Sequence, residues 1–396
     1  MTKDFSQTSR EELVGRARDL IPVMRERAAD TEKARKLLDE TIKDFHDTGL
    51  MRMHQPKRVG GAETHFTTLL ETCATIAEGC ASSSWNLINL ACHHWMLAMY
   101  PPRAQDDVWG ISPDQLIGSS VVFPAGRAKK VKGGYELSGR WPFSSAIDCS
   151  DWLMLGGIVP DDGTPQGDWR VFLVPTSECE VIDTWHVMGL SGTGSKDVAG
   201  EGLFVPEHRT LSIHDVKGGP TPGGEVNPAP LYKIPMMGIF PYLLCPTALG
   251  NAQGAYNGFV ETTKARIASY NASKIAEHQS MQIKVGKAGA LADTAGLIFK
   301  SGYDEAMETA VAGKAPDLKR KLELRRDCAF GVGLCTEAID TLFGASGGGG
   351  LYQRNPMERM FRDAHAIQAH IAFSFDVAGG AAGKYALGLG SDNPML

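Results

Sequence analysis

Long uninterrupted apolar runs are missing from this sequence of 396 residues. The most apolar window, Trp85 to Met99, contains two asparagines and the pair His93 and His94, so it predicts a buried helix and not a segment that spans a bilayer. The first five residues also lack the apolar core of a signal peptide. We therefore expect a cytoplasmic protein without a membrane partner.

A strong positive charge is missing as well. The chain has 40 Lys and Arg against 46 Asp and Glu, and this net charge of -6 gives no basic surface for a nucleic acid. The eight cysteines form no Cys-x-x-Cys pair and no evident cluster with histidine, so they predict reduced core thiols and no metal site. No Gly-x-Gly-x-x-Gly motif links a predicted strand to a helix, which argues against a dinucleotide site for NAD(P)H.

Hydrophobic periodicity divides the chain into three domains. Residues 1–116 have helical spacing, and Ser9 and Glu12 form a capping box before the first helix. Residues 117–230 hold short apolar runs between Gly, Pro, Asp and Ser, a pattern typical of an antiparallel barrel or sandwich of about seven strands. Residues 231–396 return to helical spacing and predict a helical bundle. The expected fold is mainly α with a central β-domain.

Several boundaries follow from the same patterns. Strands are predicted at 121–123 and at 179–187, and the long central helix of the third domain is predicted at 247–271. Residues 217–230 contain four Gly and four Pro, and therefore predict a linker or a mobile loop.

The stretch from Gly139 to Trp152 has the composition of a binding platform. Trp141 and Phe143 flank it, and the hydroxyls of Ser144 and Ser145 lie near its centre. A loop at a strand edge with this composition places a flat apolar surface beside hydrogen-bonding groups, which suits a planar cofactor. A hairpin corner in a β-domain explains the same residues equally well.

The order of the three domains resembles that of the acyl-CoA dehydrogenase superfamily, in which a four-helix bundle follows the β-domain. The motifs that carry the resemblance are Lys130 to Trp141, Gly192 to Ser195, Leu203 to Pro206, Leu249 to Arg266 and Arg362 to Ala364. A dehydrogenase of this family needs a carboxylate that removes a proton from the substrate. No acid occurs in residues 364–375 or 235–256, where the family carries it, so we do not expect a dehydrogenase.

The end of the chain resembles instead the two-component flavin-dependent monooxygenases that share this fold. The resemblance rests on His370, on Ser374 to Asp376 and on the tail from Gly383 to Leu389. It implies reduced FMN or FAD from a separate NAD(P)H-dependent flavin reductase, O2, a flavin hydroperoxide, a small aromatic and phenolic substrate, and a homotetramer. Oxygenation of sulfur or nitrogen, a dehydrogenase with an unrecognised base, and a catalytically inactive flavin-binding protein remain alternatives.

The resemblance also implies roles for individual residues. Ser145 would contact the flavin N5, while His94 and His370 would act on the substrate and on the bound oxygen. The other implied cofactor residues are Ser120, Trp141, Phe143, Ser144, Arg266, Gly348 and Gly349, and Tyr270 is the other implied substrate residue. Each has a structural alternative: hydroxyls paired with backbone, core aromatics, a satisfied core histidine, an exposed arginine and a flexible glycine loop. His93 points about 100° away from His94 on a helix, so we do not expect it to take part.

Overall fold

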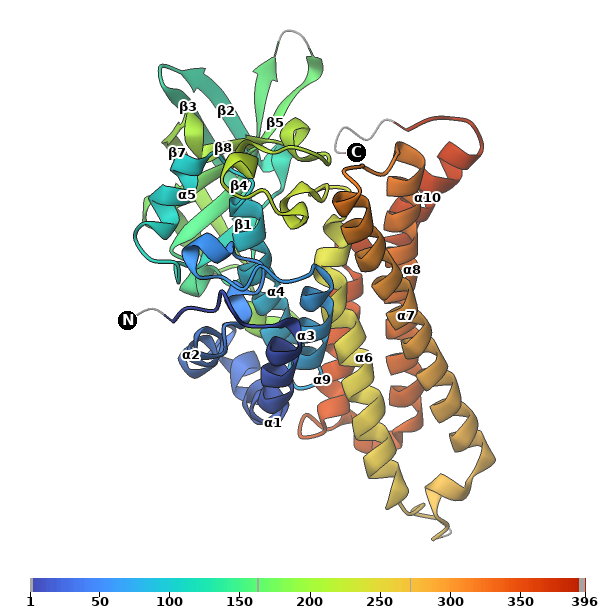
Figure 1. Ribbon diagram of the computed structural model, residues 1–396. Coiled ribbons are helices and arrows are strands. Elements are labelled where there is room, and N and C mark those ends of the chain that lie inside the picture. Colours follow the sequence, from blue (N-terminus) through green and yellow to red (C-terminus); the bar gives the residue numbers. More distant parts are fainter. Residues whose placement is uncertain (1–2, 162–163, 271, 392–395) are drawn as a thin grey trace.

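The computed structural model describes residues 3–161, 164–270, 272–391 and 396. Within this part of the chain, a helical region, a β-domain and a set of long helices follow one another in the predicted order (Figure 1). The β-domain lies beside one end of the long helices, and the N-terminal helices pack against their flank.

The N-terminal helices begin and end close to the predicted positions. The capping box is confirmed, because the backbone N–H of Glu12 donates to Ser9 Oγ at 3.2 Å and that of Ser9 donates to Glu12 Oε2 at 2.7 Å. The helices are α1 (Arg10–Ala34), α2 (Asp39–Thr48), α3 (Thr67–Ala77), α4 (Ala81–Leu97) and α5 (Pro102–Trp109). Almost every residue of α4 is buried, so this helix is the centre of the region.

The β-domain is one eight-stranded sheet in the described residues, with the order β6-β7-β3-β2-β4-β5-β8 and with β1 paired to β4. Its strands are β1 (Ile117–Ser120), β2 (Gly126–Val131), β3 (Gly134–Ser144), β4 (Trp152–Asp161), β5 (Thr164–Pro175), β6 (Glu180–Ile182), β7 (Lys196–Pro206) and β8 (Thr210–Ser212). The strand predicted at 121–123 is wrong: β1 ends at Ser120, and a short turn of helix begins at Phe123. The prediction at 179–187 is too long, since β6 ends at Ile182.

The third region contains α6 (Phe240–Lys264), α7 (Gln279–Val311), α8 (Leu318–Ala345), α9 (Pro356–Gln368) and α10 (Phe375–Ala386). Helix α6 begins seven residues before the predicted start at 247, and Pro241 lies in its first turn, where proline is well tolerated. Helix α6 ends at Lys264, so the predicted helix is too long over residues 265–270, and its predicted end at Asn271 lies outside the described residues. Among those residues, α8 alone is long and apolar enough to cross a membrane, but 56% of its apolar window is buried in the protein, so packing in the bundle explains its composition.

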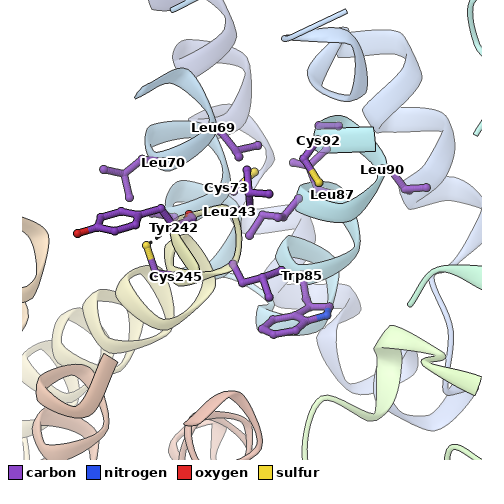
Figure 2. Packing of buried hydrophobic residues seen from close by; sticks show 14 of the residues in the cluster. Leu69, Leu70, Cys73, Trp85, Leu87, Leu90, Cys92, Tyr242, Leu243 and Cys245 are labelled. Atoms are coloured by element: carbon purple, nitrogen blue, oxygen red, sulfur yellow. Dashed lines mark hydrogen bonds between the residues drawn. The ribbon is translucent and has the colours of Figure 1, made fainter. Parts of the chain in front are cut away.

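One apolar core joins the N-terminal helices to the long helices. Figure 2 shows side chains of α3, α4 and α6 packed together. The labelled residues are Leu69, Leu70 and Cys73 of α3, Trp85, Leu87, Leu90 and Cys92 of α4, and Tyr242, Leu243 and Cys245 of α6. Such close packing fixes the position and the rotation of α4, and α4 supplies several residues of the candidate site.

The segment 217–230 is not the free linker that its composition predicts. The backbone N–H of Gly223 donates to Met99 O at 2.9 Å. The buried Asn227 donates to Ala98 O and to Gln105 Oε1, each at 2.8 Å, and accepts from Arg58 Nε at 2.9 Å. These bonds hold the segment against the N-terminal helices.

Candidate active site

The end of β3 carries a strained turn that exposes an aromatic ring. Phe143 has φ 63° and Ala146 has φ 59°. A left-handed conformation costs a residue other than glycine about 1–2 kcal/mol. Phe143 is nevertheless 62% exposed, and its ring meets that of Trp185 edge-on, at 6.2 Å between ring centroids and an interplanar angle of 86°. Strain that holds an apolar ring in solvent indicates a binding surface.

Trp141 does not contribute to this surface. Its ring is fully buried in the separate core of the β-domain, and its Nε1 donates to Gly156 O at 2.6 Å. The prediction that Trp141 forms a wall of the flavin site is therefore corrected, because no face of the ring is free. The half-buried Trp185 takes the place beside Phe143, and nothing in its sequence neighbourhood marked it as a site residue.

The predicted serines differ in what their hydroxyls do. Ser120 Oγ donates to Pro142 O at 2.6 Å, and Ser144 Oγ donates to Ser119 O at 3.3 Å, so both tie β1 to β3. Ser145 instead faces α4, where it accepts from Trp85 Nε1 at 3.1 Å. Ser120 and Ser144 position the turn, whereas Ser145 has an oxygen lone pair left for a ligand.

His370 lies against the same tryptophan. Its ring is 5.7 Å from that of Trp85, 6.4 Å from that of Phe240 and 5.8 Å from that of Phe373. Burial among these rings lowers the pKa of His370 to about 4, so the imidazole is neutral at pH 7. Its Nδ1 accepts the backbone N–H of Ala372 at 3.1 Å, which leaves the proton on Nε2. Trp85 therefore contacts both Ser145 and His370.

His94 lies elsewhere. On α4 it is rotated about 180° from Trp85, at 100° per residue. Its Nδ1 accepts from Trp109 Nε1 at 3.1 Å, and Gln55 Nε2 lies 3.4 Å away, so the ring belongs to the polar core of the N-terminal region. Burial lowers the pKa of His94 to about 3. The structure does not bring His94 to Ser145 and His370.

His93, which was not expected to take part, is on the Trp85 side of α4. It is rotated only about 80° from Trp85, and Asn89 lies between them at the i+4 position. Its Nδ1 donates to Ile117 O in β1 at 2.6 Å, so its Nε2 carries a lone pair. Burial lowers the pKa of His93 to about 4. The spacing of residues 85, 89 and 93 was the sequence signal for this face.

The predicted phosphate residues form a second cluster far from the first. Arg266 donates from Nη1 to Ala345 O at 3.0 Å and from Nη2 to Ser346 O at 2.7 Å, so it caps the last turn of α8. Gly348 and Gly349 follow with open space where a Cβ would lie. Helix α6 is 25 residues long and separates this cluster from Phe240, beside His370, by about 37 Å at 1.5 Å per residue.

Tyr270 follows α6 and belongs to neither cluster. Its side chain is fully exposed. Within a single chain, Ser145 is therefore far from Arg266, Gly348 and Gly349, and Tyr270 is not beside it either.

Comparisons with known proteins give the family. The family models named Acyl-CoA dehydrogenase, N-terminal domain and Acyl-CoA dehydrogenase, C-terminal domain match residues 9–109 and 242–375. The oxygenase subunit HsaA of a flavin-dependent monooxygenase from Rhodococcus jostii is 36% identical over 354 residues, which are 89% of this chain and 92% of that protein. The chain belongs to the oxygenase subunits of flavin-dependent monooxygenases.

Two further relatives agree with this family. The oxygenase component of an FADH2-dependent resorcinol hydroxylase from Rhizobium sp. is 34% identical, with 95% of this chain and 94% of that protein covered. The crystal structure of a 3-HSA hydroxylase from Rhodococcus sp. matches with a TM-score of 0.92 at 34% identity, over 97% of this chain and 99% of that one.

The residues of this flavin-dependent monooxygenase fit its cofactor. The exposed Phe143 ring and the edge-on Trp185 offer an apolar corner to a planar ring system. Ser145 keeps an acceptor beside it, and His370 offers an Nε2–H that has no partner among the described residues. These groups would hold the flavin ring at the end of β3.

Proposed function

We propose that this chain is the oxygenase component that hydroxylates a small phenolic compound with O2 and with reduced FMN or FAD. A separate NAD(P)H-dependent flavin reductase would supply the reduced flavin, as the word subunit or component in the relatives' names suggests. The observation that carries the proposal is the position of Trp85, which donates from Nε1 to Ser145 at 3.1 Å and whose ring centroid is 5.7 Å from that of the neutral His370. The buried, neutral His93 follows on the same side of α4.

Bound reduced flavin would supply the two electrons that reduce one atom of O2 to water while the other atom enters the substrate. Two side chains of the protein then act on protons, one as acceptor and the other as donor. His93 Nε2 accepts a hydrogen bond from a phenol hydroxyl and draws its proton away as charge develops on the ring. This raises the electron density of the substrate ring, where the oxygen atom is to be added. His370 Nε2 holds a proton that it can donate to oxygen in the same region.

Two expectations belong to this proposal and not to the comparisons. The first is a cytoplasmic location. The second is a homotetramer, in which Arg266, Gly348 and Gly349 of one copy complete the flavin site of another. The distance of about 37 Å along α6 favours such sharing. Exposed apolar side chains on the long helices, Ile283 at 64% and Leu297 at 71%, are available for contact with a second copy.

The test supplies chemically reduced FMN or FAD under anaerobic conditions, and then oxygenated buffer with a panel of phenols, thioethers and amines. We expect a hydroxylated phenol, identified by mass spectrometry, with one oxygen atom from 18O2. A sulfoxide or an N-oxide with unreacted phenols would change the substrate class, and release of H2O2 alone across the panel would contradict the proposed function.

A further inference from the structure

A row of hydroxyl groups runs from Ser145 into the protein, away from the turn. Ser145 Oγ lies 2.8 Å from Ser195 Oγ, and Ser195 Oγ lies 2.7 Å from Thr193 Oγ1. Thr193 Oγ1 is 2.8 Å from Leu190 O. We call Ser145, Ser195 and Thr193 the hydroxyl relay.

The two ends of the hydroxyl relay fix the direction of every hydrogen bond in it. An indole N–H only donates and a carbonyl oxygen only accepts, and each hydroxyl has one proton. Thr193 must give its proton to Leu190 O, so it accepts from Ser195. Ser195 has then used its proton and accepts from Ser145. Ser145 in turn accepts from Trp85 Nε1.

The backbone around the relay opposes a reversal of these bonds. Leu190 O also accepts from Trp185 Nε1 at 3.1 Å, and the Leu190 N–H donates to the buried carboxylate of Asp363 at 2.7 Å. The carbonyl of Thr193 accepts the N–H of Ala146 at 3.0 Å. The acceptor end of the relay is therefore held by Asp363 of α9 and by Ala146 in the turn that follows β3.

From this geometry we propose that the hydroxyl relay makes Ser145 an acceptor toward the flavin and thereby selects the reduced cofactor. The inference rests on the proposed function and on the contact between Ser145 and the flavin N5 that the resemblance to the family implies. Reduced flavin carries a hydrogen on N5 and can donate to the free lone pair of Ser145. Oxidised flavin has a lone pair on N5 and would need the Ser145 proton, which the relay directs to Ser195. Ser195 and Thr193 are thus positioning residues for redox-state selection.

The experiment measures the dissociation constants of reduced FMN, under anaerobic conditions, and of oxidised FMN by fluorescence titration. In Ser195→Ala the proton of Ser145 is released toward N5, so the ratio of the oxidised to the reduced constant should fall about twofold to tenfold, the range of one net hydrogen bond. Thr193→Val keeps the side-chain shape and lets Ser195 donate to Ser145, so the ratio should fall similarly. Thr193→Val therefore tests the inference even if Ser195→Ala does not fold.

The matched controls are Thr193→Ser, which retains the hydroxyl, and Ser191→Ala. Ser191 is in the same loop, but its Oγ donates to Val187 O at 3.0 Å, outside the relay. Both should keep the wild-type ratio. An unchanged ratio in both Ser195→Ala and Thr193→Val overturns the inference and leaves the proposed function intact. A wild-type protein that binds neither form of FMN or FAD contradicts the proposed function itself.

Discussion

His93 and His94 are neighbours in the sequence, and their surroundings give them opposite chemistry. His93 donates from Nδ1 to Ile117 O and keeps a lone pair on Nε2. His94 accepts at Nδ1 from Trp109 and keeps a proton on a buried Nε2 that has no partner among the described residues. Composition alone cannot distinguish them, because the difference comes from the tertiary partner that each Nδ1 finds.

This difference predicts distinct outcomes for two adjacent substitutions. His93→Ala should lower the rate of hydroxylation by about 100-fold or more, the usual contribution of an acid–base group, while oxygen consumption continues as H2O2 release. His94→Ala should mainly reduce the free energy of unfolding by about 1–3 kcal/mol, because Trp109 Nε1 loses its acceptor. Product yield per O2 and thermal unfolding separate the two effects. Loss of coupling in His94→Ala with full coupling in His93→Ala would reverse our assignment.

Asp363 gives a pH-dependent prediction. Burial raises the pKa of this fully buried carboxyl group to about 6. The folded protein therefore holds the Asp363 proton more tightly than the unfolded chain, so its stabilisation is present below about pH 4 and is lost as the pH rises through 6. Asp363→Asn keeps an acceptor for Leu190 but has no proton to lose. Its free energy of unfolding relative to wild type should increase by about 2–3 kcal/mol between pH 4 and pH 7.

Urea denaturation at several pH values measures this difference. Asp293→Asn, on an exposed position of α7, is the matched control and should show no such change. A difference between Asp363→Asn and wild type that stays constant with pH would mean that Asp363 is ionised throughout the range.

At the scale of helices and strands, the sequence predicted the features that depend on the local spacing of apolar residues. The helices of the first region, the capping box of α1 and the β-domain were all recoverable from apolar spacing and from Gly and Pro positions. The start of α6 was missed: the helix begins at Phe240, with Pro241 in its first turn, where proline is tolerated, and Pro246 inside the helix. The 217–230 segment was misread because its composition does not reveal the partners of Asn227.

That segment supplies a prediction of its own. Asn227→Ala removes three hydrogen bonds and takes away the acceptor of Arg58 Nε, so the free energy of unfolding should fall by about 2–4 kcal/mol. Limited proteolysis should then cut within residues 217–230 of the native protein. Glu225→Ala, at an exposed position of the segment, should behave as wild type. Equal protease resistance of Asn227→Ala and wild type would show that the glycines and prolines hold the segment without these bonds.

At the scale of the whole molecule, the candidate site could be only half predicted. His370 is far from Phe143 and Ser145 in the sequence, and the resemblance to a family named all three without giving their distances. The α6 helix then separates Arg266 from this group by about 37 Å. A list of residues along one chain contains no information on which copy of the chain supplies each of them.

Sharing of the site between copies can be tested by mixing two inactive variants. Phe143→Glu places a charge on the apolar corner, and Arg266→Glu repels a phosphate, so each variant alone should fail to bind flavin. If two copies share two sites, random mixing makes about half of the pairs hybrid, and each hybrid has one site with both halves intact. About a quarter of the wild-type flavin binding should therefore return after co-expression. Co-expression of Phe143→Glu with Phe143→Arg should restore none, since both variants damage the same half. If hybrids form, as native mass spectrometry would show, and flavin binding stays absent, Arg266 does not serve the Phe143 site of another copy.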